Sequence, residues 1–430
     1  MPLDYSAYIQ ILKEELVPAM GCTEPIAVAY GAAKVRELLG KVPEKIIVHV
    51  SGNIVKNVKS VIVPNTGGLK GIEASVAVGV IAGDAGKMLE VISQVSDEQR
   101  KEIIEYMNSG VIDVRMADDC HIFDIIIDAY SGNLHSKIRI TDSHTNIVLM
   151  ERDGKILHSV DVVPEEELYN TEDNIFTVAD ILEFADTVPI EDVYDIIERQ
   201  IRYNTAISEE GLKGDYGANI GKTLLKVYGS DIKTRARAAA AAGSDARMSG
   251  CELPVIITSG SGNQGMTASL PVIEYAKELG CAYNEDGSIH EKLIRALLVS
   301  DLITLHVKSG IGRLSAYCGA VCAGCAAGAA ISYMLGGHLE EVSHTLVNSL
   351  AIVSGIVCDG AKPSCAAKIA SAVDAGLLGH YMYENGKQFY AGDGIVSKGV
   401  EKTIKNVDRL GRDGMSETDK EIIRIMLEKL

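Results

Sequence analysis

Residues Ala316 to Leu335 read AYCGAVCAGCAAGAAISYML and include no charged side chain. The segment is long enough to span a membrane, but Ala, Gly and Cys contribute little transfer free energy, so we interpret it as a buried helix of a globular core. Side chains this small let neighbouring helices approach closely. Aromatic residues make up only 5% of the chain and Trp is absent, so we expect closely packed helices throughout the molecule. The sequence predicts tightly packed helices with a core of Ala, Gly, Val, Ile and Leu.

The hydrophobic period changes along the chain. Apolar residues recur at helical spacing over residues 3–40, apart from a break at Gly21–Pro25, and over most of the chain after Pro164. Between these parts, apolar and polar residues alternate as they do in strands. We therefore predict a mainly α-helical catalytic domain plus a smaller α+β domain with a mostly antiparallel sheet. The expected bounds are 1–40 together with 163–430 for the helical domain, and 41–162 for the α+β domain.

Within the α+β domain, the run KIIVHVSGNIVKNV (45–58) is predicted as a strand, and it would place Ser51, Asn53 and Asn57 on one face. A helix of small residues is expected at Gly71–Ala82. Several further strands are expected between Val111 and Val162.

The charge balance limits the partners. The chain has 41 basic and 59 acidic residues, a net charge of −18, and such a surface repels phosphate backbones and anionic lipid headgroups. We expect neither nucleic acid nor a membrane as a partner. The first 20 residues lack the basic and apolar regions of a signal peptide, and the chain contains nine cysteines. We therefore expect a cytoplasmic protein whose cysteines are thiols or metal ligands rather than disulfides.

Two cysteines flank a predicted turn in IVCDGAKPSCAAK. Cys358 would lie at the end of one helix and Cys365 in the first turn of the next, capped by Ser364, where the helix dipole favours a thiolate. Cys318, from a separate helix, would complete a set of three thiolates, and a cluster held by three cysteines keeps one iron open for catalysis. Two alternatives remain open: core cysteines beside a turn, or a structural zinc at Cys358 and Cys365 in a protein that is not an enzyme.

The spacing of Cys318, Cys322 and Cys325 also matches the C-x3-C-x2-C motif of radical-SAM enzymes. On a helix, however, the first and last of these cysteines are separated by roughly 10 Å of rise, too far to wrap one compact cluster. The chain also lacks the repeated βα pattern of a barrel. A motif without its structural context is a weak signal.

Residues Gly260–Gly265 read GSGNQG, a formal G-x-G-x-x-G between an apolar run and a predicted helix. This motif supports a rival hypothesis, a nicotinamide-dependent dehydrogenase, although the acidic residue expected roughly 20 positions later is missing. We prefer another role, in which the free N–H groups at the helix N-terminus hold a carboxylate. Two further polar clusters are GCTEP, which puts Cys22 and Glu24 at a helix break, and DSHTN, which puts His144 in a turn. Capping and turn chemistry would also explain each of these clusters.

Several segments together resemble the cysteine desulfidase family, which is related to the α part of bacterial iron–sulfur L-serine dehydratases. These are PAMGCTEP, SGNIVKNVKSVIVPNTGGLKG, HTNIV, SGSGNQG, YCGAVCAG and CDGAKPSCAAK, and they span nearly the whole chain. The resemblance implies a [4Fe–4S] cluster bound by Cys318, Cys358 and Cys365, with Cys22 a functional thiol at the site. The chain departs from the family's spacing at PNTGG, which affects the roles of Asn65 and Thr66.

The expected reaction is a β-elimination that converts L-cysteine to pyruvate, ammonia and hydrogen sulfide, without pyridoxal phosphate. L-serine is the alternative substrate. Cys22 is our first candidate for the base that takes the α-proton, and His144 is the second. A homo-oligomer is left open. The residues expected to hold the substrate are Glu24, Asn53, Asn65, Thr66, Ser261, Asn263 and Gln264.

Overall fold

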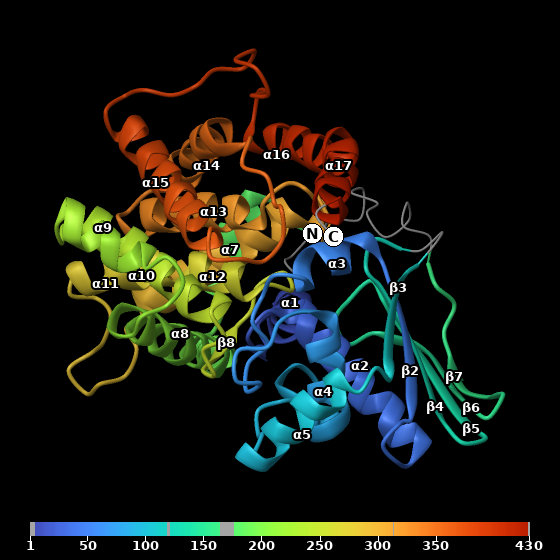
Figure 1. Cartoon of the computed structure of the whole chain (residues 1–430). Helices are drawn as coiled ribbons and strands as arrows, with labels where there is room; N and C mark the ends of the chain where they lie inside the picture. The colour runs from blue at the N-terminus through green and yellow to red at the C-terminus, as the bar shows by residue number, and fades with distance from the viewer. Residues whose placement is uncertain (1–4, 118–120, 164–175, 313, 429–430) are drawn as a thin grey trace.

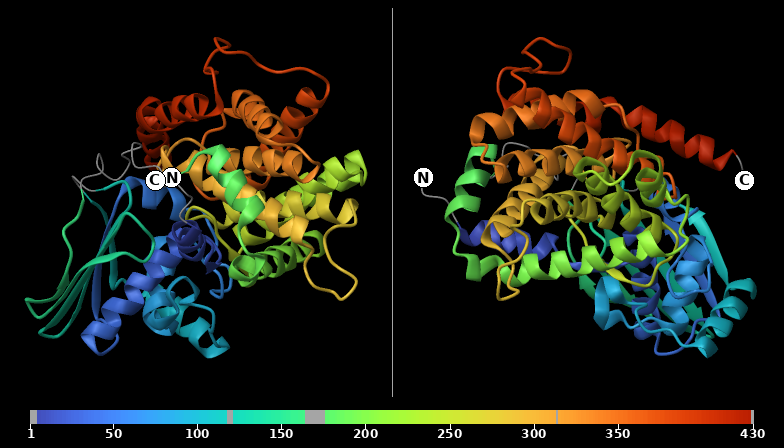
Figure 2. Two further views of the ribbon diagram at one scale, coloured as in Figure 1. Left: turned by 180° about the vertical axis from the view of Figure 1, so that it is seen from behind. Right: turned by 90° about the vertical axis from the view of Figure 1, so that its left-hand side faces the viewer.

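A computed structural model of the chain describes residues 5–117, 121–163, 176–312 and 314–428. It consists of a helical body and a smaller α+β body that lie side by side (Figures 1 and 2). This arrangement confirms the predicted fold class. The elements of the helical body are α1 (Tyr5–Glu15), α7 (Val178–Thr187), α8 (Ile190–Lys213), α9 (Ile220–Tyr228), α10 (Ile232–Met248), α11 (Gly262–Glu278), α12 (Glu291–Ser309), α13 (Gly319–Met334), α14 (Leu339–Val353), α15 (Cys365–Glu384), α16 (Val400–Arg409), the π-helical turn η3 (Leu410–Gly414) and α17 (Ser416–Leu427).

The α+β body is a six-stranded sheet with helices packed on it. Its strand order is β3-β2-β4-β5-β6-β7, in which only β2 and β3 run parallel, so the predicted antiparallel character is confirmed. Helix α2 covers one face, and a side chain at Gly31 would touch Ile127 and Ile138 of the sheet. The elements are α2 (Thr23–Leu39), β2 (Lys45–Val50), α3 (Gly52–Val58), α4 (Gly71–Ala82), η1 (Ala85–Glu90), α5 (Asp97–Asn108), β3 (Ile112–Met116), β4 (Asp124–Ser131), β5 (Leu134–Thr141), β6 (Ile147–Arg152) and β7 (Lys155–Ser159).

Small residues let the central helices α13 and α15 touch through their backbones. A Cβ atom on Gly324 would lie 2.6 Å from the carbonyl carbon of Ala372, and one on Gly328 would lie 2.6 Å from the Cα of Gly376. The two contact pairs advance in the same direction along both helices, so α13 and α15 are parallel and begin at the same end of the body. The small-residue segment therefore forms a buried helix, as predicted, and it sets where the two helix N-termini meet.

The run predicted as one long strand is instead a strand followed by a helix. Strand β2 ends at Val50, and α3 begins immediately afterwards because the Ser51 hydroxyl accepts a hydrogen bond from the Ile54 N–H. The prediction that Asn53 and Asn57 share a strand face is therefore wrong. They still lie on one side of the segment, since positions i and i+4 of a helix are neighbours.

The break predicted at residues 21–25 is longer than expected. It includes a short strand, β1 (Pro18–Met20), which pairs antiparallel with β8 (Pro254–Ile256) and joins the N-terminal segment to the helical body. Helix α2, which follows, packs against α4 and the sheet, so most of it belongs with the α+β body. The division at residues 40/41 and 162/163 stays a prediction, and α2 lies on the helical side of it in sequence although it packs on the sheet.

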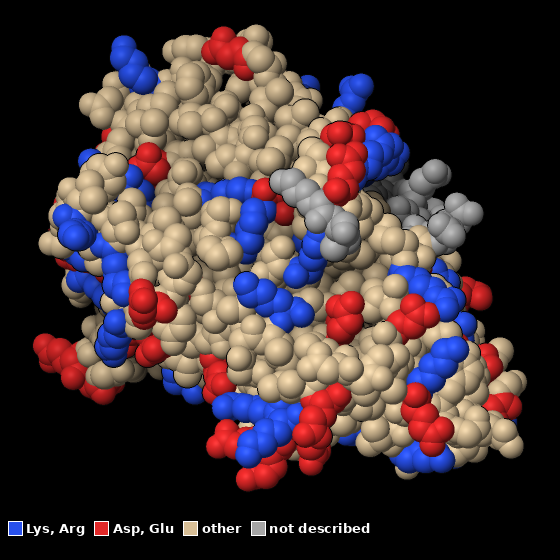
Figure 3. All heavy atoms as spheres, in the orientation of Figure 1, with Lys and Arg blue, Asp and Glu red and all other residues tan. Residues whose placement is uncertain are grey.

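The surface carries charges of both signs. Figure 3 shows one face, on which acidic and basic side chains are interspersed and Lys and Arg gather near the middle. The net charge of −18 is therefore not spread as a uniform acidic layer over this face. Among the described helices, none is both long and apolar enough to cross a membrane.

Candidate active site

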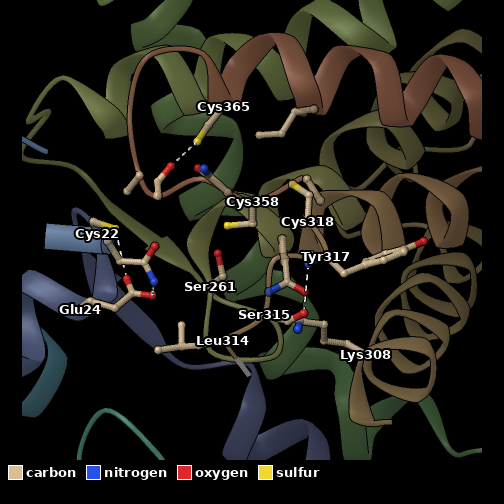
Figure 4. A pocket seen from close by; sticks show the side chains of 18 of the residues that line it. Cys22, Glu24, Ser261, Lys308, Leu314, Ser315, Tyr317, Cys318, Cys358 and Cys365 are labelled. Carbon is tan, nitrogen blue, oxygen red and sulfur yellow. Dashed lines mark hydrogen bonds between the residues drawn. The ribbon is translucent and has the colours of Figure 1, made fainter. Parts of the chain in front are cut away.

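A cavity lies where the N-termini of α2, α11, α13 and α15 converge (Figure 4). Cys22, Ser261 and Cys318 are the residues immediately before α2, α11 and α13, and Cys365 is the first residue of α15. Each helix directs free N–H groups and the positive end of its dipole towards the cavity, which therefore favours anionic groups.

Cys318 and Cys358 are placed by a short piece of backbone pairing. Tyr317 pairs antiparallel with Val357, and the two flanking backbone hydrogen bonds are 2.6 and 3.2 Å long. Because side chains alternate along paired extended segments, Cys318 and Cys358 project to the same face, towards the cavity. We predicted that Cys358 lies at the end of a helix. This prediction is wrong, because α14 already ends at Val353.

Cys365 begins α15 as predicted, and its N–H donates to the Lys362 carbonyl at 3.0 Å. Its sulfur lies 3.7 Å from the Gly360 carbonyl oxygen. Ser364 precedes the helix, but its side chain makes no capping hydrogen bond, because its own backbone is already in the right-handed helical conformation. The predicted position of Cys365 is confirmed, whereas the predicted cap is wrong.

The thiols of Cys318 and Cys365 are protonated when no metal is bound. Burial, followed by the neighbouring Cys358 thiol, raises the pKa of Cys318 to about 12, and burial is also the main cause that raises the pKa of Cys365. The prediction that a helix N-terminus makes Cys365 a thiolate is therefore wrong for the free protein, since desolvation outweighs the dipole. Cations near the thiols include Lys368, which forms an ion pair with Asp359. Metal binding would release the thiol protons.

The donor set fits a cluster better than a single ion. Within the described ranges of the chain, no three His, Cys, Asp or Glu side chains lie close enough to hold one metal ion, which argues against a structural zinc at Cys358 and Cys365. A cubane cluster binds each cysteine through a different iron, so its ligands stand further apart. Three free cysteines around a cavity with positive helix ends match an anionic cluster of that kind.

Cys22 and Glu24 form a hydrogen-bonded pair at the edge of the cavity (Figure 4). The Cys22 thiol donates to Glu24 Oε2 at 3.2 Å, and the other carboxylate oxygen accepts from Asn57 Nδ2 at 3.3 Å. Burial, and then the charge of Glu24, raise the pKa of Cys22 well above its ordinary value. The resting thiol is therefore protonated, with a carboxylate in place to take its proton.

The start of α11 supplies the polar wall of the cavity. Ser261, Asn263 and Gln264 all line it, as expected for a helix N-terminus that holds a polar ligand. Sequence reasoning missed Arg247, whose Nε donates to the Gly21 carbonyl at 2.9 Å and whose Nη1 donates to Asn263 Oδ1 at 3.1 Å. Its segment, RAAAAAGSDARM, also contains Arg237, and nothing in the sequence distinguishes the two arginines.

Lys308 is a second cavity cation that sequence reasoning missed. It lies in the last turn of α12, where basic residues are common, and nothing in the sequence marks it as functional.

Four predicted residues are not among those that line the cavity. Asn65 and Thr66 hold a loop instead: Asn65 Nδ2 donates to the distant Ile92 carbonyl, and Thr66 Oγ1 closes a turn by donating to the Val63 carbonyl, both at 2.7 Å. Asn53 lines an adjacent cavity bounded by α17. The His144 ring packs edge-on against Phe123, with 4.9 Å between the ring centroids.

The G-x-G-x-x-G segment does not have the structure of a dinucleotide-binding loop. The strand before it, β8, has three residues and pairs antiparallel with β1. A dinucleotide-binding unit needs a second, parallel strand after the helix, and no strand follows α11 in the part of the chain that the structure describes. The dehydrogenase hypothesis is therefore wrong on structural grounds.

Comparisons with known proteins give the family of the chain. Residues 86–424 match the serine dehydratase alpha chain family. Over its full length the chain is similar to a UPF0597 protein of Desulfitobacterium hafniense, with 60% identity over 99% of this chain and 97% of that relative. It is also similar to UPF0597 proteins of Lachnoclostridium phytofermentans, with 52% identity over 98% and 100% of the two chains, and of Treponema denticola, with 48% identity over 100% of both.

Proposed function

This chain belongs to the serine dehydratase alpha chain family, and we propose on that basis that it is an iron–sulfur-dependent lyase acting on a small amino acid. The favoured substrate is L-cysteine, which would be converted to pyruvate, ammonia and hydrogen sulfide. The observation that carries the proposal is the meeting of Cys318, Cys358 and Cys365 in one cavity with the Cys22–Glu24 pair. These groups come from distant segments, and packing of hydrophobic residues alone does not require them to meet.

The three cysteines would hold a [4Fe–4S] cluster. When bound, such a cluster supplies a Lewis-acidic iron without a protein ligand, which stabilises negative charge on the substrate or its leaving group. The protein supports the thiolates through the N-termini of α13 and α15 and through Lys368, whose charge lies near Cys318 and Cys365.

The Cys22–Glu24 pair would remove the α-proton. Glu24 accepts the thiol proton along the existing 3.2 Å hydrogen bond, and the Cys22 sulfur then accepts the proton from the substrate Cα. The electron pair left on Cα forms the double bond as the leaving group departs. The pair takes precedence over His144, because both of its members line the cavity whereas His144 does not. The aminoacrylate product then hydrolyses to pyruvate and ammonia.

L-serine is the second candidate substrate, and the description of the family supports it. The two reactions differ only in the group that leaves the β-carbon, sulfide or hydroxide. Both would use the same cluster, the same base and the same polar wall at the start of α11. Parallel assays of anaerobically purified protein with L-cysteine and L-serine, with sulfide and pyruvate measured together, decide between them.

The test of the proposal as a whole is iron content combined with activity. We expect roughly four iron and four sulfide per chain after anaerobic purification, the content of one cubane. Changing Cys318, Cys358 or Cys365 to Ala should remove both the iron and the activity. Cys325→Ala is the matched control, because Cys325 is also buried on α13 but does not line the cavity. Full iron content in Cys365→Ala would overturn the proposed ligand set.

A further inference from the structure

Arg247 is a buried cation without a negatively charged partner in the part of the chain that the structure describes. Its side chain lines the cavity although the residue is only 2% exposed. Nε donates to the Gly21 carbonyl and Nη1 to the Asn263 amide oxygen, while Nη2 is buried and has no hydrogen-bond partner among the described residues. Among the residues that the structure describes, Arg247 forms no ion pair. Leaving a guanidinium in this state is unfavourable, because buried charges are normally paired.

The surroundings of Arg247 add to the positive charge. A Cβ atom on Gly262 would lie 2.5 Å from Arg247 Nε and 2.8 Å from Cζ, so the guanidinium packs directly against the first turn of α11. Helix α11 has 17 residues, and its N-terminus is the positive end of its dipole. A cation and a helix N-terminus placed together repel one another unless an anion lies between them. Glycine at position 262 is what allows this close approach.

We propose that Arg247 binds the α-carboxylate of the amino-acid substrate, using Nη2 together with the N–H groups at the start of α11. This inference rests on the proposed elimination and adds to it a residue that selects the substrate. The two existing hydrogen bonds of Arg247 hold the guanidinium plane fixed, which suits the planar geometry of a carboxylate. Because Gly21 precedes Cys22, the same contact fixes the substrate relative to the Cys22–Glu24 pair. The substrate class is then a small amino acid with a free carboxylate, rather than an amide or a peptide.

Calorimetric binding of unreactive analogues tests this proposal directly. L-alanine keeps the α-amine and the carboxylate but has no leaving group, and L-alaninamide lacks the carboxylate. We expect the anaerobically purified wild type to bind L-alanine at least about 30-fold more tightly than L-alaninamide, since charge-assisted hydrogen bonds have that strength. Arg247→Met should abolish this preference. Absent binding of L-alanine to the wild type, or equal affinity for the two ligands, would overturn the proposal.

Two further variants control for folding and for charge. Arg235→Met removes an arginine from the same helix, α10, where it pairs with Glu278 at the surface, and it should keep the preference for L-alanine. Arg247→Lys retains the charge but not the planar fork, and it should bind L-alanine with reduced affinity. If Arg247→Met does not fold, the test rests on Arg247→Lys. An unchanged preference of this variant for L-alanine over L-alaninamide would count against the proposal.

Steady-state kinetics separate a failure of this inference from a failure of the proposed function. If elimination is observed, Arg247→Lys should raise KM much more than it lowers kcat, because a carboxylate contact is equal in the ground and transition states. If the wild type shows no elimination but binds L-alanine in an Arg247-dependent way, the carboxylate site stands and the proposed reaction is wrong. Active enzyme with unchanged KM in both variants would leave the reaction standing and refute the role of Arg247.

Discussion

Single side chains in this protein differ in what burial does to them. The thiol of Cys22 is buried beside a carboxylate that accepts its hydrogen bond, so its proton has a defined destination. Asp301 is buried beside neutral donors, and one of its carboxylate oxygens has no hydrogen-bond partner among the described residues. The arrangement of Cys22 suits proton transfer, whereas the burial of Asp301 makes the stability of the protein depend on pH.

The Cys22–Glu24 pair can be tested without changing the three cysteines that are proposed to hold a cluster. Cys22→Ser and Glu24→Gln should each lower kcat and kcat/KM together by roughly two orders of magnitude, the scale of losing a general acid–base group, while the iron content stays unchanged. Steady-state assays alongside iron analysis measure both quantities. Cys281→Ser serves as the control, since Cys281 is buried but does not line the cavity. Loss of iron in Cys22→Ser would show that this residue is a cluster ligand instead.

Asp301 should make the protein less stable as the pH rises from about 4 to about 7. Its Oδ1 accepts hydrogen bonds from Gln200 at 2.9 Å and Thr258 at 3.0 Å, but burial outweighs them and raises its pKa from 3.8 to about 7. The folded state therefore holds a proton that the unfolded chain releases near pH 4. The stabilisation is complete below that pH and is lost as the pH rises to about 7, at about 1.4 kcal/mol per pH unit within the window.

The variant that removes this effect is Asp301→Asn, which keeps the accepting oxygen but cannot ionise. The free energy of unfolding can be measured with urea at several pH values between 4.5 and 7.5. As the pH rises, it should decline less in the variant than in the wild type. Subtracting the two curves removes the contribution of other titrating groups. If the unfolding free energies of the wild type and the variant declined in parallel with pH, Asp301 would not titrate in this range.

At the scale of elements, the close contact between α13 and α15 determines where their first residues lie. Their contact brings Cys318 and Cys365 to one end of the helical body, because both helices begin there. The helical period and the small-residue composition were sufficient to predict these helices and the position of Cys365. They could not predict that Cys318 and Cys358 are aligned by backbone pairing, since a single bridge has no periodic signal in the sequence.

The mistaken strand prediction has a similar cause. Over a short run, alternation along β2 and the i, i+4 spacing of α3 both place apolar residues at even positions, such as Val50, Ile54 and Val58. Only the hydroxyl of Ser51 marks the change from strand to helix. Arg247 was missed for a different reason, because a buried arginine and an exposed one look the same in a helix of alanines.

Gly328→Ala tests the dependence of the site on helix packing. The added Cβ would lie 2.6 Å from the Cα of Gly376, so α13 and α15 must separate. We expect a loss of about 1–3 kcal/mol in the free energy of unfolding, the usual range for overpacking, together with a reduced iron content. Denaturant unfolding and iron analysis give the two measurements. Gly355→Ala is the control, because a Cβ there meets nothing within 4 Å, and equal behaviour of the two variants would contradict this account.

At the scale of the whole molecule, the cavity lies where the two bodies meet. Cys22 and Glu24 come from the start of α2, whose body packs on the sheet, while Cys318, Cys358 and Cys365 belong to the helical body. Sequence patterns predicted both bodies, and eight of the twelve predicted site residues line the cavity. They could not predict which loops of the α+β body reach the cavity, and for this reason Asn65 and Thr66 were assigned to substrate binding although they hold a loop.

The pairing of β1 with β8 has a consequence for how the protein is made. Pro18–Met20 emerges from the ribosome early, but its partner Pro254–Ile256 and the cysteines of α13 and α15 follow only much later. Contacts between such distant segments form slowly, because a long loop must close first. The N-terminal segment therefore lacks its partner during most of synthesis. The proposed cluster would have all three of its ligands only after Cys365 has been made, so it would be loaded late, onto an almost finished fold.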